Sequence, residues 1–430
     1  MRRRLPRRPD GMPPHDPALA TTQSSPAPRR RVALLALIGT MTAIGPLGTD
    51  TYLPALPAVV EHLDATDSHG QATLAIYLFG LGIGQLVWGP LSDRIGRRLP
   101  LILGLTAFAL SALACAIAPS MIVLIIARLI MGVAGSAGVV ISRAIVRDLY
   151  EGTKLAQIFA RLTIVFAIAP IIGPLVGSII LQFTDWRGTF VALACVGVVL
   201  VAAALFLVPE TLTPERKVVA GRAAQLEAWG SVLRHSRFRL YVSLLVLICA
   251  GMYLYVTFAS LVLQGEWGVE DWQFGLIFGI NAIAVLSGGQ LTAWLVKRVP
   301  GDRILLVTLT ANLAITGLVL WGALGHWPVA WFDVVIWLFV FQVSIGQPLT
   351  IALALAPFAK AAGTAAAVQG AMQFSLGSLV PLIIAAIWGT SGVVLGASLV
   401  VLAVAALIVA IIGMRTLGRR EDAAAAAELE

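Results

Sequence analysis

The chain is poor in charged residues, cysteine and histidine. Only 12% of its 430 residues are charged, whereas a soluble globular domain has about 25%. Hydrophobic residues make up 59%, more than the single core of a water-soluble chain of this length can bury. These proportions exclude a soluble enzyme, a disordered protein and a nucleic-acid-binding module. They leave a protein with many membrane-spanning segments.

The few cysteines and histidines carry no metal-site signature. Cys115, Cys195 and Cys249 lie within apolar runs, so we interpret them as core residues without disulfides. No two histidines have the i, i+4 spacing of a zinc motif, and neither a phosphate-binding loop nor a catalytic cluster is present. We therefore expect no enzyme activity, no metal and no cofactor, and an ion gradient must drive any transport.

Apolar runs of membrane-spanning length recur along the whole chain. At about 20–25 residues per span, a chain of this length accommodates a dozen. A charged linker, residues 209–239, separates six runs from six. The sequence therefore predicts an all-α membrane protein with twelve transmembrane helices, at residues 32–58, 72–91, 99–118, 121–142, 157–181, 188–208, 240–263, 273–295, 303–324, 331–356, 363–388 and 392–414.

Positive residues fall on one side of these spans. Of the 30 lysines and arginines, all but Arg128, Arg161 and Arg187 lie in the tails, the central linker or alternate loops. Acidic residues dominate the opposite loops. Because cytoplasmic loops are enriched in Lys and Arg, we expect both termini in the cytoplasm and the spans in a bacterial inner (plasma) membrane. Residues 1–31 then form a disordered basic tail, and 415–430 a second cytoplasmic tail.

The two halves of the chain resemble each other. The sequence from Gly89 to Arg98 follows the second span, and a related sequence from Gly289 to Arg298 follows the eighth. The first glycine and the final basic pair keep their spacing, whereas Ala293 stands in place of Asp93. Two parallel repeats predict two pseudo-symmetric six-helix bundles, residues 32–208 and 240–414, with a binding site between them near mid-bilayer.

The loop after the second span, residues 89–98, resembles the signature loop of the major facilitator superfamily. It reads Gly-Pro-Leu-Ser-Asp-Arg-Ile-Gly-Arg-Arg. We expect Gly89 to let two helices approach closely, Asp93 to face a helix N-terminus, and Arg97 to pair with Asp93 and with Asp148. The alternative is that the loop supplies only positive-inside charge. The resemblance implies a cytoplasmic latch that holds one state of the transport cycle, formed by Gly89, Asp93, Arg94, Gly96, Arg97, Arg98 and Asp148.

The fifth span resembles the proline- and glycine-containing motif of the drug:proton antiporter branch of that family. Proline kinks a helix, and glycine permits tight packing. The match is incomplete at Ala160, Ala169 and Ser178, where the family prefers glycine. The resemblance implies export rather than uptake, and ordinary packing by small residues is the alternative. The residues that keep the spacing of the motif are Pro170, Gly173, Pro174 and Gly177.

Asp50 is an isolated carboxylate within the first span. Together with the sequence Arg143–Asp148, it resembles Bcr/CflA-like multidrug efflux carriers, which implies that Asp50 binds and releases the coupling proton. Some of these carriers have a second acid two turns earlier, where this chain has Thr42. An ionisable residue in a span is costly and is a functional candidate by default. The alternative is that Asp50 caps a helix that restarts after Pro46 and Gly48.

Arg128, in the fourth span, matches an arginine motif of the same family. A buried guanidinium needs a partner, and Asp50 or a substrate carbonyl are the candidates. If Arg128 approaches Asp50 in one state of the cycle, it favours loss of the proton there. The alternative is a structural arginine bonded to backbone carbonyls.

Polar side chains within the spans are candidates for a substrate cavity. Hydrogen bonds between helices explain most of them. A mostly apolar cavity with few polar anchors suits small amphipathic or lipophilic compounds. The residues that we expect to line it are Tyr77, Tyr253, Asn281, Gln342 and Gln373.

These features together predict proton-coupled efflux of small amphipathic or lipophilic compounds, such as antibiotics, by alternating access. The alternative is a proton-coupled carrier of one native metabolite, such as a sugar or an amino acid. That function favours more charged anchors in the spans than Asp50 and Arg128. The expected partners are the small-molecule substrate, protons and the lipid bilayer, with no nucleic acid and no obligatory protein partner.

Overall fold

The computed structural model describes residues 28–213 and 222–427, and these are helical with short connections and no strand. Residues 1–27, 214–221 and 428–430 lie outside the described residues, and with them most of the predicted N-terminal tail, part of the predicted linker and the end of the C-terminal tail. Helices are expected here because, in hydrocarbon, a helix satisfies every backbone hydrogen bond within its own segment.

The first half of the chain forms six long helices, of which the first is broken near its end. Beyond the break, a short 3₁₀ turn and a short helix complete that first segment. In chain order the elements are α1 (Pro28–Asp50), η2 (Leu53–Ala55), α2 (Leu56–His62), α3 (Asp67–Ile95), α4 (Arg98–Ala116), α5 (Met121–Leu149), α6 (Gly152–Leu181) and α7 (Arg187–Leu207).

The second half repeats this plan after a helix in the linker. Its elements are α8 (Arg222–Arg234), α9 (Ser236–Ser260), η4 (Leu261–Glu266), α10 (Asp271–Leu295), α11 (Gly301–Leu324), α12 (Val329–Leu355), η5 (Ala356–Ala361), α13 (Ala362–Trp388) and α14 (Gly392–Ala427). The predicted linker therefore contains a helix, and the last helix continues beyond the predicted end of the last span through the described part of the tail.

Eleven helices among the described residues are long and apolar enough to cross a membrane. The remaining predicted span falls in α6, a 30-residue helix that contains the apolar stretch 168–181. Large apolar side chains point outward from α4, α7, α11 and α14, among them Leu110, Phe206, Val307 and Val401. Such outward apolar faces are what lipid contact requires, and the predicted twelve-helix membrane fold is confirmed.

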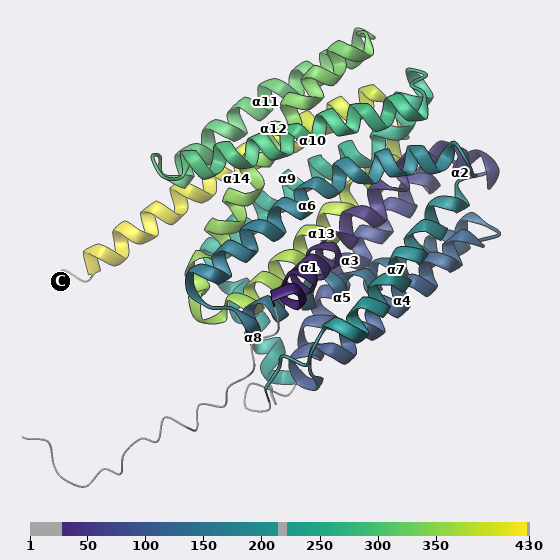
Figure 1. Ribbon diagram of the computed structural model, residues 1–430. Helices are drawn as coiled ribbons and strands as arrows, with labels where there is room; N and C mark the ends of the chain where they lie inside the picture. The colour runs from purple at the N-terminus through teal and green to yellow at the C-terminus, as the bar shows by residue number, and fades with distance from the viewer. Residues whose placement is uncertain (1–27, 214–221, 428–430) are drawn as a thin grey trace, which may run out of the picture.

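The main helix contacts in the first half have counterparts in the second. The pairs α3 with α5, α4 with α7 and α1 with α6 correspond to α10 with α12, α11 with α14 and α9 with α13. The two halves meet mainly through α3 against α13 and α6 against α10. Figure 1 shows the purple-to-blue helices gathered on one side and the green-to-yellow helices on the other, with α6, α9 and α13 between them.

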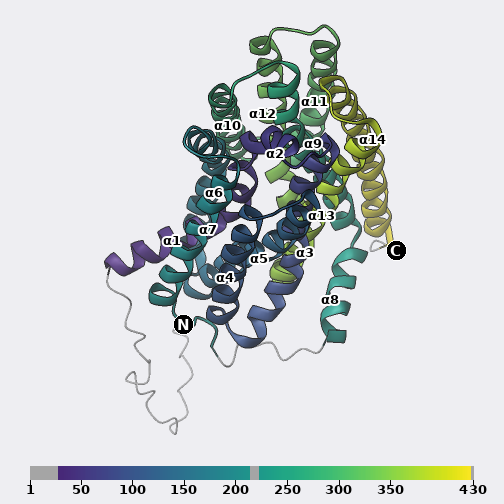
Figure 2. The ribbon, with the colours of Figure 1, turned by 90° about the vertical axis from the view of Figure 1, so that its right-hand side faces the viewer.

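The two ends of the bundle differ in what joins the halves. We call the end that holds the α3–α4 loop and α8 the linker end, and the opposite end the far end (Figure 2). At the far end, Ser68 Oγ donates to the Ala385 carbonyl at 2.8 Å, and Gln71 Nε2 donates to the Thr257 carbonyl at 2.7 Å. Ser178 Oγ donates to the Asp271 carbonyl at 2.8 Å. The far end is therefore closed by hydrogen bonds between the halves.

Candidate functional site

Asp50 is the last residue of α1 and is 6% exposed. The α-helix ends at Asp50 and a 3₁₀ turn follows. Pro54, four residues on, has no N–H group that could donate to the Asp50 carbonyl and continue the helix. The residues at the N-cap positions of η2 and α2 are Tyr52 and Ala55, and neither makes a side-chain cap hydrogen bond. Helix α1 also runs unbroken through Pro46. The alternative that Asp50 caps a restarted helix is therefore wrong.

Two glycines of the antiporter motif pack directly on this break. A methyl group added at Gly173 would come within 2.7 Å of Asp50 Cβ. One added at Gly177 would come within 2.2 Å of the Thr51 carbonyl oxygen. Helix α6 thus approaches the Asp50 backbone more closely than any residue with a side chain permits. The remaining motif residues, Pro170 and Pro174, lie within the same continuous helix.

Arg128 is fully buried inside the first half. Its Nη1 donates to the Gly48 carbonyl at 2.6 Å, and its Nε donates to the Thr73 carbonyl at 3.2 Å. The guanidinium carbon lies 4.3 Å from the ring centre of Tyr77 and 5.0 Å from that of Tyr52. A cation over aromatic faces and carbonyls is stabilised without a counter-ion. In this structure Arg128 is a structural arginine bonded to backbone carbonyls, as the alternative interpretation expected. No ion pair between Arg128 and Asp50 is found among the described residues.

Tyr77 belongs to the same buried cluster, so its predicted place in a substrate cavity is wrong. Its side chain is fully buried, and its hydroxyl donates to the Ile44 and Gly45 carbonyls at 3.1 Å. Together with Arg128, it ties α3 and α5 to the part of α1 that precedes Asp50. The cluster fixes the backbone that carries Asp50.

The signature loop forms an ion-pair network. Arg97 pairs with Asp93, and its Nε donates to Asp148 Oδ2 at 2.9 Å. Arg97 Nη1 also donates to Ser92 Oγ at 2.9 Å. Partial burial alone would lower the pKa of Arg97, but the hydrogen bonds to Asp148 and Asp93 outweigh it and raise the pKa. The network joins α3 to the end of α5 with a permanent positive charge, in the arrangement that the sequence predicted.

The linker completes this network through Glu210, which the sequence analysis missed. Glu210 accepts the backbone N–H groups of Arg97 at 2.8 Å and Arg98 at 3.2 Å, at the N-terminus of α4. Partial burial raises the pKa of Glu210, but these hydrogen bonds and one from Leu212 outweigh it and lower the pKa. We expected Asp93 to face a helix N-terminus. At this loop Glu210 does so instead, because the helix dipole favours a nearby carboxylate.

Gly89 and Gly96 of the loop differ in how closely neighbouring atoms pack on them. A methyl group at Gly89 would meet only a Val140 side chain, at an ordinary 3.6 Å, so the predicted tight approach at Gly89 is wrong. Gly96 has φ +107°, and a methyl group there would lie 2.4 Å from Glu210 Oε2. Gly96 is therefore the glycine that the loop requires.

The outer arginines of the loop bind nearby groups. Arg94 donates to the Gln225 side chain at 3.4 Å, and Arg98 donates to the Leu205 carbonyl at 2.6 Å.

A cluster of uncharged polar side chains lies where the halves meet. Gln369 Nε2 donates to Gln373 Oε1 at 2.8 Å, and Gln347 Nε2 lies 3.5 Å from Cys249 Sγ. From the first half, Gln85 approaches Gly370, at which a methyl group would meet its Oε1 at 2.2 Å. Tyr253, a predicted cavity residue, stacks on Phe374 with ring centres 6.0 Å apart. We call the set Gln85, Cys249, Tyr253, Gln347, Gln369 and Gln373 the interface amide cluster.

Asn281 lies inside the second half, away from this cluster. It is 2% exposed, and its Nδ2 donates to Asp333 Oδ1 at 2.6 Å and to the Tyr255 hydroxyl at 3.3 Å. Its Oδ1 is buried without a partner. Asp333 is an acid within a membrane-spanning helix that the sequence analysis missed. A carboxylate two residues into the predicted tenth span was the signal that could have found it.

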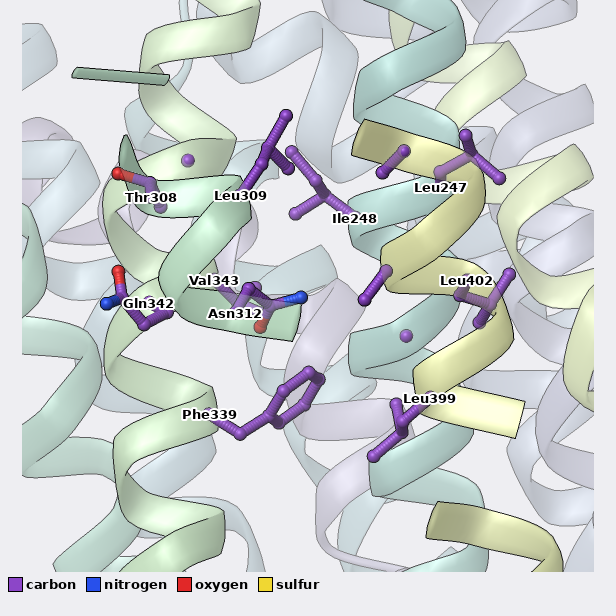
Figure 3. A pocket seen from close by; sticks show the side chains of 14 residues that line it. Leu247, Ile248, Thr308, Leu309, Asn312, Phe339, Gln342, Val343, Leu399 and Leu402 are labelled. Atoms are coloured by element: carbon purple, nitrogen blue, oxygen red, sulfur yellow. The ribbon is translucent and has the colours of Figure 1, made fainter. Parts of the chain in front are cut away.

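Gln342 lines a small cavity within the second half, between α9, α11, α12 and α14, rather than a cavity between the halves. Figure 3 shows it on the wall with Asn312, Phe339 and Leu399. The volume is about 20 Å³, and a second cavity beside Tyr255 and Asp333 has about 10 Å³. A drug-sized ligand needs roughly 300 Å³ or more. Neither cavity is a substrate site; each has room for about one water molecule.

Two six-helix halves, joined by one linker and holding buried ionisable groups beside their interface, define a secondary transporter of the alternating-access type. The family model of the Major Facilitator Superfamily matches residues 38–381, and the chain belongs to this family. It is a multi-pass membrane protein of a family of transporters.

Individual relatives agree with this assignment. The chain is 35% identical to the uncharacterized MFS-type transporter YdgK of Bacillus subtilis, over 88% of this chain and 95% of that protein. It is 28% identical to the bicyclomycin resistance protein homolog of Haemophilus influenzae, over 81% of this chain and 87% of that one. Among solved structures, a POT family transporter in complex with a thioalcohol-conjugated peptide superimposes with TM-score 0.72 at 14% identity, over 91% and 96% of the two chains. At that identity the likeness concerns the fold alone.

Proposed function

We propose that this transporter exports small, mainly uncharged amphipathic compounds, such as antibiotics, in exchange for protons. The observation that carries the proposal is the placement of Asp50. Its carboxyl group is buried at the break of the first span, and the antiporter-motif glycines of α6 pack on its backbone. A carboxyl group removed from water and given no cation binds a proton readily, and a proton-binding group next to a moving interface is what antiport requires.

The interface amide cluster supports an uncharged cargo. Its members are amides, a thiol and a phenol, which can donate and accept hydrogen bonds but carry no fixed charge near neutral pH. The relative named for bicyclomycin resistance supports an antibiotic as cargo. We propose that Tyr253 and Gln373 contact the cargo within this cluster. Asn281 and Gln342 lie elsewhere in the second half and are not included.

The proton gradient provides enough free energy for such export. One proton that moves down 100 mV releases about 2.3 kcal/mol, which supports a gradient of a neutral solute of about 50-fold. We propose that the proton and the cargo compete, so that Asp50 releases its proton when cargo binds from the cytoplasm and regains one on the opposite side. Arg128 holds the Asp50 backbone in place throughout and takes no proton itself.

The charge distribution supports an orientation with the linker end in the cytoplasm of a bacterial cell. In the sequence, the two tails, the central linker and the alternate loops that include the signature loop carry all but three of the 30 Lys and Arg residues. In this orientation the closed far end faces outward. The network of Arg97, Asp93, Asp148 and Glu210 then lies on the cytoplasmic side, where we propose that it stabilises one state of the cycle.

The test is a drug-susceptibility panel that includes bicyclomycin, in an efflux-deficient bacterial host that produces the wild-type chain, Asp50→Asn or Asp185→Asn. Asp185 is an exposed acid in the α6–α7 connection and serves as the control. We expect wild type and Asp185→Asn to confer resistance that a protonophore abolishes, and Asp50→Asn to confer none at equal membrane abundance. Full resistance with Asp50→Asn, or resistance that persists with the protonophore, would contradict the proposal.

A further inference from the structure

A glutamine of the second half reaches the broken end of the first span. Gln264 lies in η4, the π-helical turn that follows α9, and its Nε2 donates to the Pro54 carbonyl of η2 at 3.4 Å. Pro54 belongs to the 3₁₀ turn that comes directly after the break at Asp50. The same amide nitrogen donates to Asp271 Oδ1 at 2.7 Å. One amide group therefore joins the break of the first half to the first residue of α10.

Asp271 is also held by the first half, through its backbone. Ser178 Oγ of α6 donates to the Asp271 carbonyl at 2.8 Å, and Ser178 is 4% exposed. Neither glycine nor alanine at this position could make the bond, because neither has a hydroxyl group. Ser178 directly follows Gly177, the glycine that packs on the Thr51 carbonyl. Asp271 is thus bonded through both side chain and backbone at the point where α6, α10 and η2 meet.

The turn that carries Gln264 is anchored within its own half. Glu266 accepts the Gly392 N–H at 3.0 and 3.1 Å, at the N-terminus of α14, where the helix dipole favours a carboxylate. Ser260 Oγ donates to Gln264 Oε1 at 2.6 Å, so the amide nitrogen keeps both hydrogens for the contacts described above. A π-helical turn is rare and often marks a functional position. Gln264 therefore reaches the first half from a fixed base.

We propose that these contacts form a clamp that keeps the far end closed and separates Asp50 from the water at that end. The far-end clamp consists of Pro54, Ser178, Gln264 and Asp271. Its two hydrogen bonds between the halves must break when the far end opens. Gln264 and Ser178 are positioning residues, because they act on Asp50 through the segment that follows it and bind no proton. The consequence for Asp50 rests on its proposed role in proton coupling.

Release of the far-end clamp frees the segment between Asp50 and α2. In the closed state, Gly173 and Gly177 of α6 pack on one side of this segment, and Gln264 holds the Pro54 carbonyl. Asp50 is then 6% exposed. When η4 and α10 move away from η2 and α6, water replaces Gln264 at that carbonyl. Asp50 therefore exchanges its proton with the far side only while the clamp is open.

The test is hydrogen–deuterium exchange of the full-length protein in detergent, read by mass spectrometry at peptides from both ends of the bundle. The variants are Ser178→Ala, Gln264→Met and their combination. The control is Ser287→Ala in α10, because the Ser287 hydroxyl bonds within its own helix, to the Ile283 carbonyl at 2.8 Å. The same samples are treated with a water-soluble carbodiimide, which modifies accessible carboxyl groups, and the rate of labelling at Asp50 is followed.

We expect exchange at residues 51–62 and 261–275 to rise about fivefold in each single variant, as loss of one hydrogen bond between the halves predicts. The combined variant should exceed both single variants, and Ser287→Ala should match wild type. Exchange at the linker end should fall, because in alternating access one end closes as the other opens. Labelling of Asp50 should accelerate by a similar factor.

A rise in exchange at both ends would indicate general loosening of the fold and would overturn the proposal. Unchanged exchange in either single variant, or a shift in exchange without faster labelling of Asp50, overturns it as well. Because these measurements need no transport, their failure removes the far-end clamp alone. Full resistance with Asp50→Asn removes the proposed function instead and leaves the exchange result in place.

Discussion

The two halves of the molecule share one helix plan but handle charge differently. In the first half, Arg97 of the signature loop binds Asp93 and Asp148. In the second half, the corresponding loop has Ala293 in place of the aspartate, and Arg298 stacks on Trp294 with its guanidinium carbon 3.9 Å from the ring centre. The corresponding loops therefore carry an ion-pair network in one half and a cation–aromatic contact in the other.

The two halves also differ in the kind of polar group that each one buries. The first half contains Arg128, a permanent cation fixed on backbone carbonyls and aromatic rings. The second half contains amides, phenols and Asp333, which can change their hydrogen bonds or protonation. This comparison teaches that the first half fixes the backbone before Asp50 with a permanent cation, whereas the second half buries groups whose hydrogen bonds or protonation can change.

Removal of the buried cation of the first half should have the largest effect on stability. Arg128→Ala leaves the Gly48 and Thr73 carbonyls without donors and opens a void beneath Tyr77. We expect the free energy of unfolding to fall by about 3–5 kcal/mol, measured by thermal denaturation in detergent. Gln342→Leu, a change of a polar residue in the second half, should shift stability by less than about 1 kcal/mol. Equal losses in the two variants would remove the contrast between the interiors.

The glycine contact beneath Asp50 should be the next most sensitive position. Gly177→Ala places a methyl group 2.2 Å from the Thr51 carbonyl oxygen and must separate α6 from the break in the first span. We expect at least about a tenfold loss of export rate, because misplacement of a reacting group by about 1 Å can cost as much as 100-fold. The matched control is Gly279→Ala in α10, whose methyl group would meet Leu175 at an ordinary 3.9 Å. Comparable export by both variants would show that the close packing is dispensable.

Loss of the arginine should slow transport moderately more in the signature loop than in the corresponding loop of the second half. Arg97→Gln removes a charge that holds Asp93 and Asp148, whereas Arg298→Gln removes only a stacking contact on Trp294. We expect Arg97→Gln to slow turnover several-fold and Arg298→Gln to leave it within about twofold. The measurement is substrate efflux from proteoliposomes at a fixed pH difference. If both variants slow transport alike, the two loops act equally and the latch is not specific to the first half.

The smallest effect concerns the pH dependence of the linker contact. Because the pKa of Glu210 is lowered in the folded protein, its contribution is fully present above the ordinary value of about 4.3 and is lost as pH falls through the lower folded value. Hydrogen exchange at the Arg97 and Arg98 amides, corrected for the intrinsic rate, should accelerate in acid. Glu210→Gln should show weaker protection at neutral pH and no such step. A step that persists in Glu210→Gln would assign it to another group.

The fold could be predicted from the sequence because hydropathy and charge act over whole segments. Twenty apolar residues specify a span whatever their order, and the positions of Lys and Arg divide the loops. The pairing of Arg97 with Asp93 and Asp148 could also be predicted, because each lies at a helix end where few partners are available.

The residues that line the interface between the halves could not be predicted in the same way. Membrane helices are apolar on most sides, so no periodic pattern tells which face meets the other half and which meets its own neighbours. Tyr77 and Gln342 were placed in a common cavity because they are polar, yet each lies within its own half. Glu210 was missed because the helix N-terminus that it caps, at Arg97 and Arg98, lies more than a hundred positions away in sequence, and no side-chain pattern reveals such a contact.

The central claim is that Asp50 gives up its proton when cargo binds. The direct measurement is proton release by the purified transporter in weakly buffered detergent solution on addition of the compound to which the susceptibility panel shows resistance, with wild type and Asp50→Asn compared at equal concentration. We expect wild type to release close to one proton per bound molecule and Asp50→Asn to bind the compound without release. Equal release by the two proteins would contradict the account, because the proton would then come from another group.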